Sequence, residues 1–485
     1  MLNLSILKTP GVYIDEVSLL PPSVAGVETG IPAFIGYTEK IATRSGKDLK
    51  LVPTKIYDMK QFEELYGMPQ PEDDALSVTI IDYVATDGTT VLRSEVKPAL
   101  SPATSASKHT LHYSMQMYFA NGGGPCYIIT VGTYTGVILK ADLDLGLKAL
   151  ESEDEPTMIV TPEAVHLSSA DYFSYNQAAL NQAGLLKDRF VIIDVQQKNT
   201  KAEDVEQGDI KTFRDGAITN NRHFGAAYYP YLDTTIDFSY VGQEDKVSIV
   251  HSKIAPDGTA SDGAHNGKKL DALKATSNLL YMQLKDQLSQ IPMQLPPSAA
   301  MAGIYATTDT ERGVWKAPAN VGVASVIGPS IRINDAIQGN LNVDTTAGKS
   351  VNVIRQLTGR GTVVWGARTL EGNDNEWRYI PVRRFFNFVE ESVKKATYRF
   401  VFEPNDANTW VKVRAMVENF LTLQWRAGAL QGAKPEQAFF VRVGLGQTMT
   451  ALDVLEGRLI VEIGMAVVRP AEFIILRFMH KLPEA

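Results

Sequence analysis

The sequence predicts a multidomain protein of mixed α/β and α+β architecture, with a middle α/β domain followed by a C-terminal α+β domain. From residue 126 onwards, apolar runs of strand length alternate with helical segments, which is typical of α/β domains. The last third instead contains two amphipathic helices followed by strand-like runs. The length of 485 residues suits about two to four domains.

The N-terminal part, residues 1–43, is expected to hold an arm and the start of the core. Residues 11–17 (GVYIDEV) mix apolar and polar side chains in the manner of a half-buried strand, and residues 32–37 (PAFIGY) form an apolar strand. Residues 44–112 are rich in Ser, Thr, Gly and Asp clusters, which favours an irregular, variable surface insertion.

The middle domain is expected over residues 113–295. Strand-like runs at CYIITV, TMIVTP, RFVIIDV and FGAAYYPYL are separated by helical or polar segments, which predicts a parallel sheet covered on both faces. Residues 233–268 interrupt this order as a loop or hairpin, and leucines near helical spacing predict an amphipathic helix between Lys268 and Gln290.

The C-terminal domain is expected over residues 296–485, including a C-terminal arm. One helix is marked by an apolar face from Val382 to Val393, and a second runs from about Asp406 to Gly428. The chain then continues in apolar strand-like runs, of which the last, EFIILRFM, would be an aggregation hazard if it stayed unpaired. We therefore expect the terminal strands to pair with something.

Composition excludes several classes of protein. With 44% hydrophobic and 21% charged residues the chain has the balance of a globular protein. The single cysteine, Cys126, rules out an intramolecular disulfide framework. A net charge of −8 argues against nucleic-acid binding. No run is long enough for a membrane helix and the N-terminus lacks a secretory signal, so synthesis in the cytoplasm is expected.

Motifs for catalysis, cofactors and metals are largely missing, and we predict none of these sites. GTVVWGAR at 361–368 lacks the lysine and hydroxyl of a phosphate-binding loop, and the seven histidines are scattered. The strand FVIID ends at Asp194, where a nucleotide-binding enzyme would hold magnesium, but an acidic residue there is more often a helix cap. An α/β hydrolase-like enzyme with a site near Asp194 is the alternative.

The C-terminal third carries a series of unusual segments. They are PPSAAMAGIYATTDTERGVWKAPAN (296–320), VWGARTL (364–370), WRYIPVRRFFNFVEES (377–392), FEPND (402–406), AFFVRVG and PAEFI. Together with the opening PGVYIDEV, they resemble the tail sheath proteins of contractile phage tails and related contractile injection systems. Residues 120–295 fit this family in layout only.

The resemblance implies a non-enzymatic structural subunit that needs no cofactor. Such subunits polymerise as stacked hexameric rings around an inner tube and contract to drive the tube through a target envelope. The partners implied are further copies of the chain, the inner tube protein, baseplate and terminator or cap proteins, and paralogous sheath subunits. Neither nucleic acid nor direct membrane insertion is implied. The particle, assembled in the bacterial cytoplasm, would be a phage tail, a cell-anchored apparatus or a released extracellular one.

In such sheaths the terminal arms complete a β-sheet in the C-terminal domain of neighbouring subunits, which matches the strands that the sequence leaves unpaired. Main-chain pairing between subunits would satisfy their N–H and C=O groups. The alternative is that both strands pair within their own subunit. The predicted arm residues are Val12, Tyr13, Ile14, Val17, Phe473, Ile474, Ile475 and Leu476.

Two further surfaces follow from the resemblance. Lys412, Asn419 and Arg426 recur every seven residues on one face of the second helix, and the family uses a C-terminal-domain helix to contact the tube through charge. We predict tube contact there; a solvated polar face is the alternative, and Arg414 on the flank is a weaker candidate. Trp315 and Pro318 are predicted at a domain junction, or alternatively in a domain core. A self-assembling shell without an inner tube remains a third possibility for the whole protein.

Overall fold

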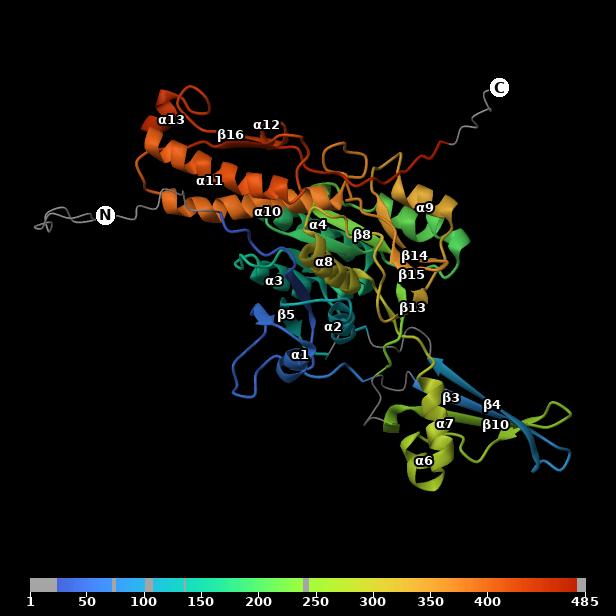
Figure 1. Ribbon diagram of the computed structural model, residues 1–485. Helices are drawn as coiled ribbons and strands as arrows, with labels where there is room; N and C mark the ends of the chain where they lie inside the picture. Colours follow the sequence, from blue (N-terminus) through green and yellow to red (C-terminus); the bar gives the residue numbers. More distant parts are fainter. Residues whose placement is uncertain (1–23, 72–75, 101–107, 135–136, 239–243, 478–485) are drawn as a thin grey trace, which may run out of the picture. The chain divides into compact units, whose positions relative to one another are not determined.

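The computed structural model (Figure 1) divides the chain into two compact units, which are considered separately. The larger unit is Glu28–Arg384, and the smaller combines the N-terminal segment through Val27 with the chain from Phe385. The division differs from the expected start of the C-terminal domain at residue 296, because residues 296–384 supply two helices and three strands to the larger unit. The residues described are 24–71, 76–100, 108–134, 137–238 and 244–477.

A mostly parallel eight-stranded sheet forms the centre of the larger unit. Its order is β15 (Gly361–Val364), β14 (Val351–Leu357), β8 (Gly225–Tyr229), β7 (Phe190–Asp194), β6 (Met158–Val160), β1 (Pro32–Tyr37), β5 (Cys126–Gly132), β2 (Thr54–Ile56). The six strands from β14 to β5 are parallel, and the two edge strands are antiparallel to their neighbours. The predicted parallel sheet is therefore present.

Helices cover both faces of this sheet, as the apolar strands require. α3 (Lys140–Leu150) and α4 (Ser169–Leu186) pack on one face, and α2 (Leu111–Ala120) and α8 (Ser298–Arg312) pack on the other. Each face of the sheet has its own buried hydrophobic cluster, and alternate residues of β1 contribute to the two clusters. Phe34 belongs to one cluster, while Ala33 and Ile35 belong to the other.

Residues 44–112, expected to be irregular, contain α1 (Met59–Tyr66) and two long antiparallel strands, β3 (Leu76–Val84) and β4 (Val91–Leu100). The expectation was wrong because the polar cluster TDGTT is only a hairpin turn. There the Asp87 carboxylate accepts hydrogen bonds from the backbone N–H groups of Thr89 and Thr90. The alternating burial along β3 is that of a strand with one covered face.

This hairpin joins a second, distant stretch of chain. β10 (Ser248–Ile254) pairs in parallel with β3 and antiparallel with β11 (Ala260–Asp262), so the predicted loop or hairpin at 233–268 contributes two strands. The expected helix over 268–290 is two helices, α6 (Asp271–Thr276) and α7 (Asn278–Leu288), separated at Ser277. α7 packs against β4 of the resulting four-stranded sheet, and α6 packs against α7 (Figure 1).

Shorter elements complete the larger unit. β9 (Leu232–Thr234) pairs with β12 (Gln294–Leu295) and β13 (Val326–Pro329) in a small antiparallel sheet. α5 (Lys211–Asp215) and α9 (Asp335–Asn342) are short helices on the chain between the central strands.

The smaller unit is built on two long helices that pack together through the rings of Phe388 and Phe420 (Figure 1). α10 (Ile380–Thr397) enters it from the larger unit, and α11 (Ala407–Arg426) begins where the Asp406 side chain accepts a hydrogen bond from the N–H of Thr409. Both predicted helices are therefore present. The remaining elements are α12 (Pro435–Ala438), β16 (Phe439–Arg442), α13 (Ala451–Leu455) and β17 (Glu462–Met465).

Candidate functional site

Asp194, the candidate for an enzyme site, has a structural role. It ends β7 and is buried, and its Oδ1 accepts a hydrogen bond of 2.7 Å from the backbone N–H of Ser298, the first residue of α8. A carboxylate at a helix N-terminus satisfies a free N–H group and interacts favourably with the helix dipole. Burial raises the pKa of Asp194 to about 7.

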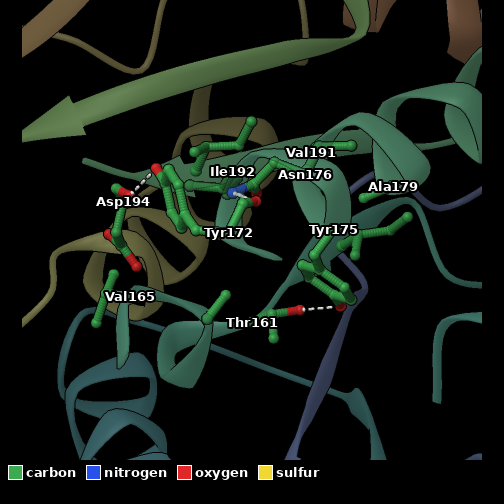
Figure 2. A pocket seen from close by; sticks show the side chains of 12 residues that line it. Thr161, Val165, Tyr172, Tyr175, Asn176, Ala179, Val191, Ile192 and Asp194 are labelled. Carbon is green, nitrogen blue, oxygen red and sulfur yellow. Dashed lines mark hydrogen bonds between the residues drawn. The ribbon is translucent and has the colours of Figure 1, made fainter. Parts of the chain in front are cut away.

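The cavity beside Asp194 is too small for a substrate. Its volume is about 10 Å³, which is enough for about one water molecule. Figure 2 shows how tyrosines close it: the Tyr172 hydroxyl donates to the Asp194 carbonyl oxygen, and the Tyr175 and Thr161 hydroxyls bond to each other. Asp194 thus joins β7 to α8 beside a nearly filled interior.

No group of three or more His, Cys, Asp or Glu side chains that could hold a metal ion occurs within the described residues. Among the helices in the described ranges, none is long and apolar enough to cross a membrane. Cys126 is buried, and burial raises the pKa of its thiol.

The sheet of the smaller unit has only two strands in the part of the chain that the structure describes. β16 and β17 pair antiparallel over four residue pairs, from Phe439 with Met465 to Arg442 with Glu462. An isolated pair of strands is at best marginally stable, and its outer edges present unpaired N–H and C=O groups. This sheet can therefore accept further strands.

An apolar groove of about 930 Å³ lies between α10 and the segment that leads into β17. One wall consists of Phe386, Val389 and Val393 from α10. Every second residue of the strand segment faces it: Leu459, Val461, Ile463 and Met465. Phe386 and Val393, which belong to the apolar face of α10 predicted from the sequence, are partly exposed.

The loop between α10 and α11 also lines this groove and was not singled out from the sequence. Phe402 is fully exposed and has a φ of 69°, in the left-handed region that is rare for a side chain of this size. The only sequence signal was the segment FEPND, which entered through the family resemblance and without a role.

The predicted C-terminal arm is strongly exposed. Phe473, Ile474, Ile475 and Leu476 are 71%, 79%, 79% and 72% exposed, and the described residues 470–477 contain no helix or strand. Four consecutive large apolar side chains in water are unusual for a folded chain, and pairing of this segment with a neighbouring subunit stays a prediction. The predicted N-terminal arm residues Val12, Tyr13, Ile14 and Val17 lie outside the described residues.

The predicted tube-facing residues of α11 share one exposed face. Lys412, Asn419 and Arg426 are all exposed, whereas Val413, Val417, Phe420 and Leu421 on the opposite side are buried. Arg414 is instead half-buried, and its Nη2 donates a hydrogen bond of 2.7 Å to the carbonyl of Val443. The geometry keeps the three residues available to a partner and gives Arg414 a contact within the unit.

Trp315 and Pro318 lie in the loop after α8, inside the larger unit. The Trp315 ring packs across Gly313, whose φ of 90° and lack of a side chain allow the close approach. The boundary between the units falls at Arg384 and Phe385, so a junction role for this pair stays a prediction.

Comparison with known proteins agrees with these features. Two family models match, the phage tail sheath protein central domain over residues 187–370 and the phage tail sheath C-terminal domain over residues 372–480. These two segments make up more than half of the chain. The chain belongs to the phage tail sheath family. The resemblance seen in the sequence is therefore confirmed.

Individual sheath proteins and assemblies are similar to the chain at modest identity. A prophage major tail sheath protein of Pseudomonas aeruginosa (strain UCBPP-PA14) is 26% identical over 131 residues, and the tail sheath protein of Enterobacteria phage T4 is 25% identical over 139 residues. These segments cover 27% and 28% of this chain but only 33% and 20% of the two relatives.

Solved structures match over almost the whole length. The sheath complex of an extracellular contractile injection system, PVC, in the contracted state is 28% identical, with a TM-score of 0.62 and 98% of each chain covered. The contracted helical sheath of the anti-feeding prophage is 29% identical, with a TM-score of 0.62, covering 98% of this chain and 100% of that one. A chain of its 6-fold symmetrised baseplate is 30% identical, with a TM-score of 0.60 and the same coverage. The mixed α/β multidomain fold is thus that of contractile sheaths.

Proposed function

We propose that this protein is a structural, non-catalytic sheath subunit that polymerises as stacked hexameric rings around an inner tube and contracts to drive the tube through a target envelope. The observation that carries the proposal is a C-terminal sheet that has two strands in the described part of the chain, in a protein whose fold is that of contractile sheaths. Two strands, an apolar groove and an exposed apolar C-terminal segment occur together in the smaller unit.

The exchange of arms gives these three features one explanation. A strand from a neighbouring subunit adds to the free edge of the β16–β17 sheet, and its alternate side chains cover apolar surface while its backbone completes the hydrogen-bond ladder. Phe473–Leu476 is the C-terminal strand of this exchange, and Val12–Val17 is the N-terminal one. The arm keeps its main-chain hydrogen bonds to the neighbour's sheet when the subunits reorient, so the rings stay linked.

The exposed face of α11 is proposed to bind the inner tube. Lys412 and Arg426 place positive charge on a helix face that the smaller unit does not cover. Exposed ion pairs contribute only about 0.2–1 kcal/mol each, so many weak contacts hold the sheath on the tube and can be released together. Residues 296–485 carry 22 Lys and Arg against 18 Asp and Glu, while the first 295 carry 25 against 37. The C-terminal part is therefore the more suitable one for an acidic tube surface.

The remaining partners follow from this role. Baseplate and terminator proteins would close the two ends of the sheath, and paralogous sheath subunits would share its lattice. Assembly would take place in the bacterial cytoplasm, and the finished particle would be a phage tail, a cell-anchored apparatus or a released particle.

Electron microscopy of negatively stained protein tests the proposal, with the chain purified alone and after co-expression with the tube protein from its own gene neighbourhood. Hollow, helically striated cylinders that enclose a tube are expected. Hollow particles without a tube, even when the tube protein is present, would instead indicate a non-contractile shell. Small uniform particles under both conditions would contradict the sheath role.

A further inference from the structure

We propose that in the unassembled subunit the groove between α10 and β17 is occupied by the N-terminal residues 11–17 of the same chain. These residues then leave it for a neighbouring subunit when the sheath forms. The proposal rests on the proposed exchange of arms and concerns the state that precedes it. During assembly, the N-terminal segment of a neighbouring subunit would replace the subunit's own N-terminal segment in the groove.

The groove needs an apolar occupant. Its walls are formed by Phe386, Val389 and Val393 on one side and by Val461 and Ile463 on the other. At about 930 Å³ it is far larger than the space for a few water molecules. Leaving such a surface in water is unfavourable, and a free subunit with an open groove and an unpaired sheet edge would aggregate.

The N-terminal segment reaches this groove from the helix that forms its wall. Val24 is buried, Gly26 lies against the ring of Phe388, and the N–H of Val27 donates a hydrogen bond of 3.1 Å to Oγ of Ser392. Residues 24–27 therefore run along α10.

The length of the connection permits the docking. Residues 18–23 separate the predicted strand from Val24, and six residues span up to about 20 Å when extended. A helix with its side chains is about 10–12 Å across. The chain can therefore pass around α10 from the side of Phe388 to the side of Val389 and Val393.

The sequence of the arm suits the site. In an extended conformation Val12 and Ile14 project from the same side of residues 11–17, so both can enter the groove while the backbone pairs with the free edge of β17. The other candidate occupant is the C-terminal segment. Its residues Phe473 to Leu476 are 71–79% exposed and none of them lines the groove, so it leaves the site open for the N-terminal arm.

Docking within the chain and docking between chains use the same contacts. Exchange between identical sites therefore costs little free energy overall and becomes favourable as subunit concentration rises, as in domain swapping. The docked arm protects the free subunit from random strand pairing. New subunits then add at the end of a growing sheath, where the groove of a neighbouring subunit can accept the arm.

Cross-linking between introduced cysteines tests this inference in the full-length chain. Ile14→Cys is combined with Ile463→Cys in one chain, and the dilute, unassembled subunit is treated with a short bifunctional maleimide. Cys126 is buried and is expected not to react. The matched control pairs Ile14→Cys with Lys412→Cys, because Lys412 is exposed and directly precedes Val413, which lines the groove.

We expect an internal cross-link in the groove pair whose rate does not depend on protein concentration and exceeds that of the control pair by about ten-fold or more. The control is needed because any tethered arm has an effective concentration in the millimolar range. Equal rates for the two pairs, or no internal cross-link, would overturn the proposal. If Ile463→Cys impairs folding, Val393→Cys provides the groove position.

A mixture of chains that each carry one of the two cysteines separates this inference from the exchange itself. Cross-links between chains are expected only after sheath assembly. If they form in the assembled sheath while the free subunit shows no internal cross-link, arm exchange stands and docking within the chain is wrong. If neither forms, both proposals fail.

Discussion

Replacing the four exposed apolar residues of the C-terminal segment, Phe473 to Leu476, by serine should abolish polymerisation and leave the subunit folded. Each side chain is 71–79% exposed in the subunit, so each has most of its apolar surface still to bury. Full burial of a large apolar side chain contributes about 1.5–3 kcal/mol. At roughly three quarters of about 2 kcal/mol each, the four residues contribute about 6 kcal/mol per arm, or about four orders of magnitude in association constant.

Two measurements separate assembly from folding. The critical concentration for sheath formation, measured by sedimentation, should rise beyond the accessible range. The free energy of unfolding of the unassembled subunit in urea should change by less than about 0.5 kcal/mol, as for other exposed sites. The matched control is Leu279→Ser with Met282→Ser, which are 76% and 55% exposed on α7 and outside the proposed arms.

Either of two results would refute this reasoning. Normal sheath formation by the serine variant would show that the segment is not an arm. A loss of several kcal/mol in subunit stability would show that it packs within its own chain. The control variant should polymerise normally, because its apolar groups have no proposed partner.

Three other changes test the remaining assignments. Deleting residues 1–18 should give a folded subunit that no longer forms helically striated cylinders in negative stain, and cylinders at the wild-type level would refute the N-terminal arm. Lys412→Glu with Arg426→Glu should weaken co-sedimentation with the tube, more at low than at high salt; unchanged binding would exclude this helix face. Asp194→Ala should destabilise the subunit by about 1–3 kcal/mol, because the Ser298 N–H loses its buried acceptor. Asp194→Asn keeps that acceptor but cannot titrate, so its free energy of unfolding should depend less on pH than that of the wild type. Native Asp194, with a pKa of about 7, holds a proton that the unfolded chain releases near pH 4. Wild-type stability relative to Asp194→Asn should therefore fall by as much as about 3 kcal/mol between pH 5 and pH 8 in urea unfolding, and parallel curves would contradict the assignment.

The sequence alone predicts the central fold where local pattern and tertiary structure agree. β7 is a short apolar run after a long helix, α4, which begins at the N-cap Ser168 and ends at Lys187 in a left-handed conformation. The exposed face of α11 also follows directly from helical periodicity. These features depend on residues that are close together in the sequence, so they can be predicted from a single sequence.

Long-range pairing could not be predicted in the same way. β3 pairs with β10 from Ser77 with Ser248 to Tyr83 with Ile254, and nothing local to either strand specifies a partner so far along the chain. β14 and β15 were missed because residues 351–360 were not assigned to any element, and the run GTVVWGAR, which contains β15, was considered only as a motif. The groove was invisible for a similar reason, since α10 and the segment 459–465 meet only in the folded unit.

The two units differ in how completely each buries its own strands, and this difference supports exchange at the C-terminal sheet rather than at the central one. The central sheet ends in short antiparallel edge strands of three and four residues, β2 and β15, which limits edge-to-edge pairing. Within the described residues, the smaller unit has a two-stranded sheet that is marginal by itself, beside an open groove. Adding a partner strand with a few apolar side chains is therefore more favourable in free energy at this sheet than at the central one. A connection made at that point can also persist while the larger units change their packing, because it depends on few side chains outside the arm.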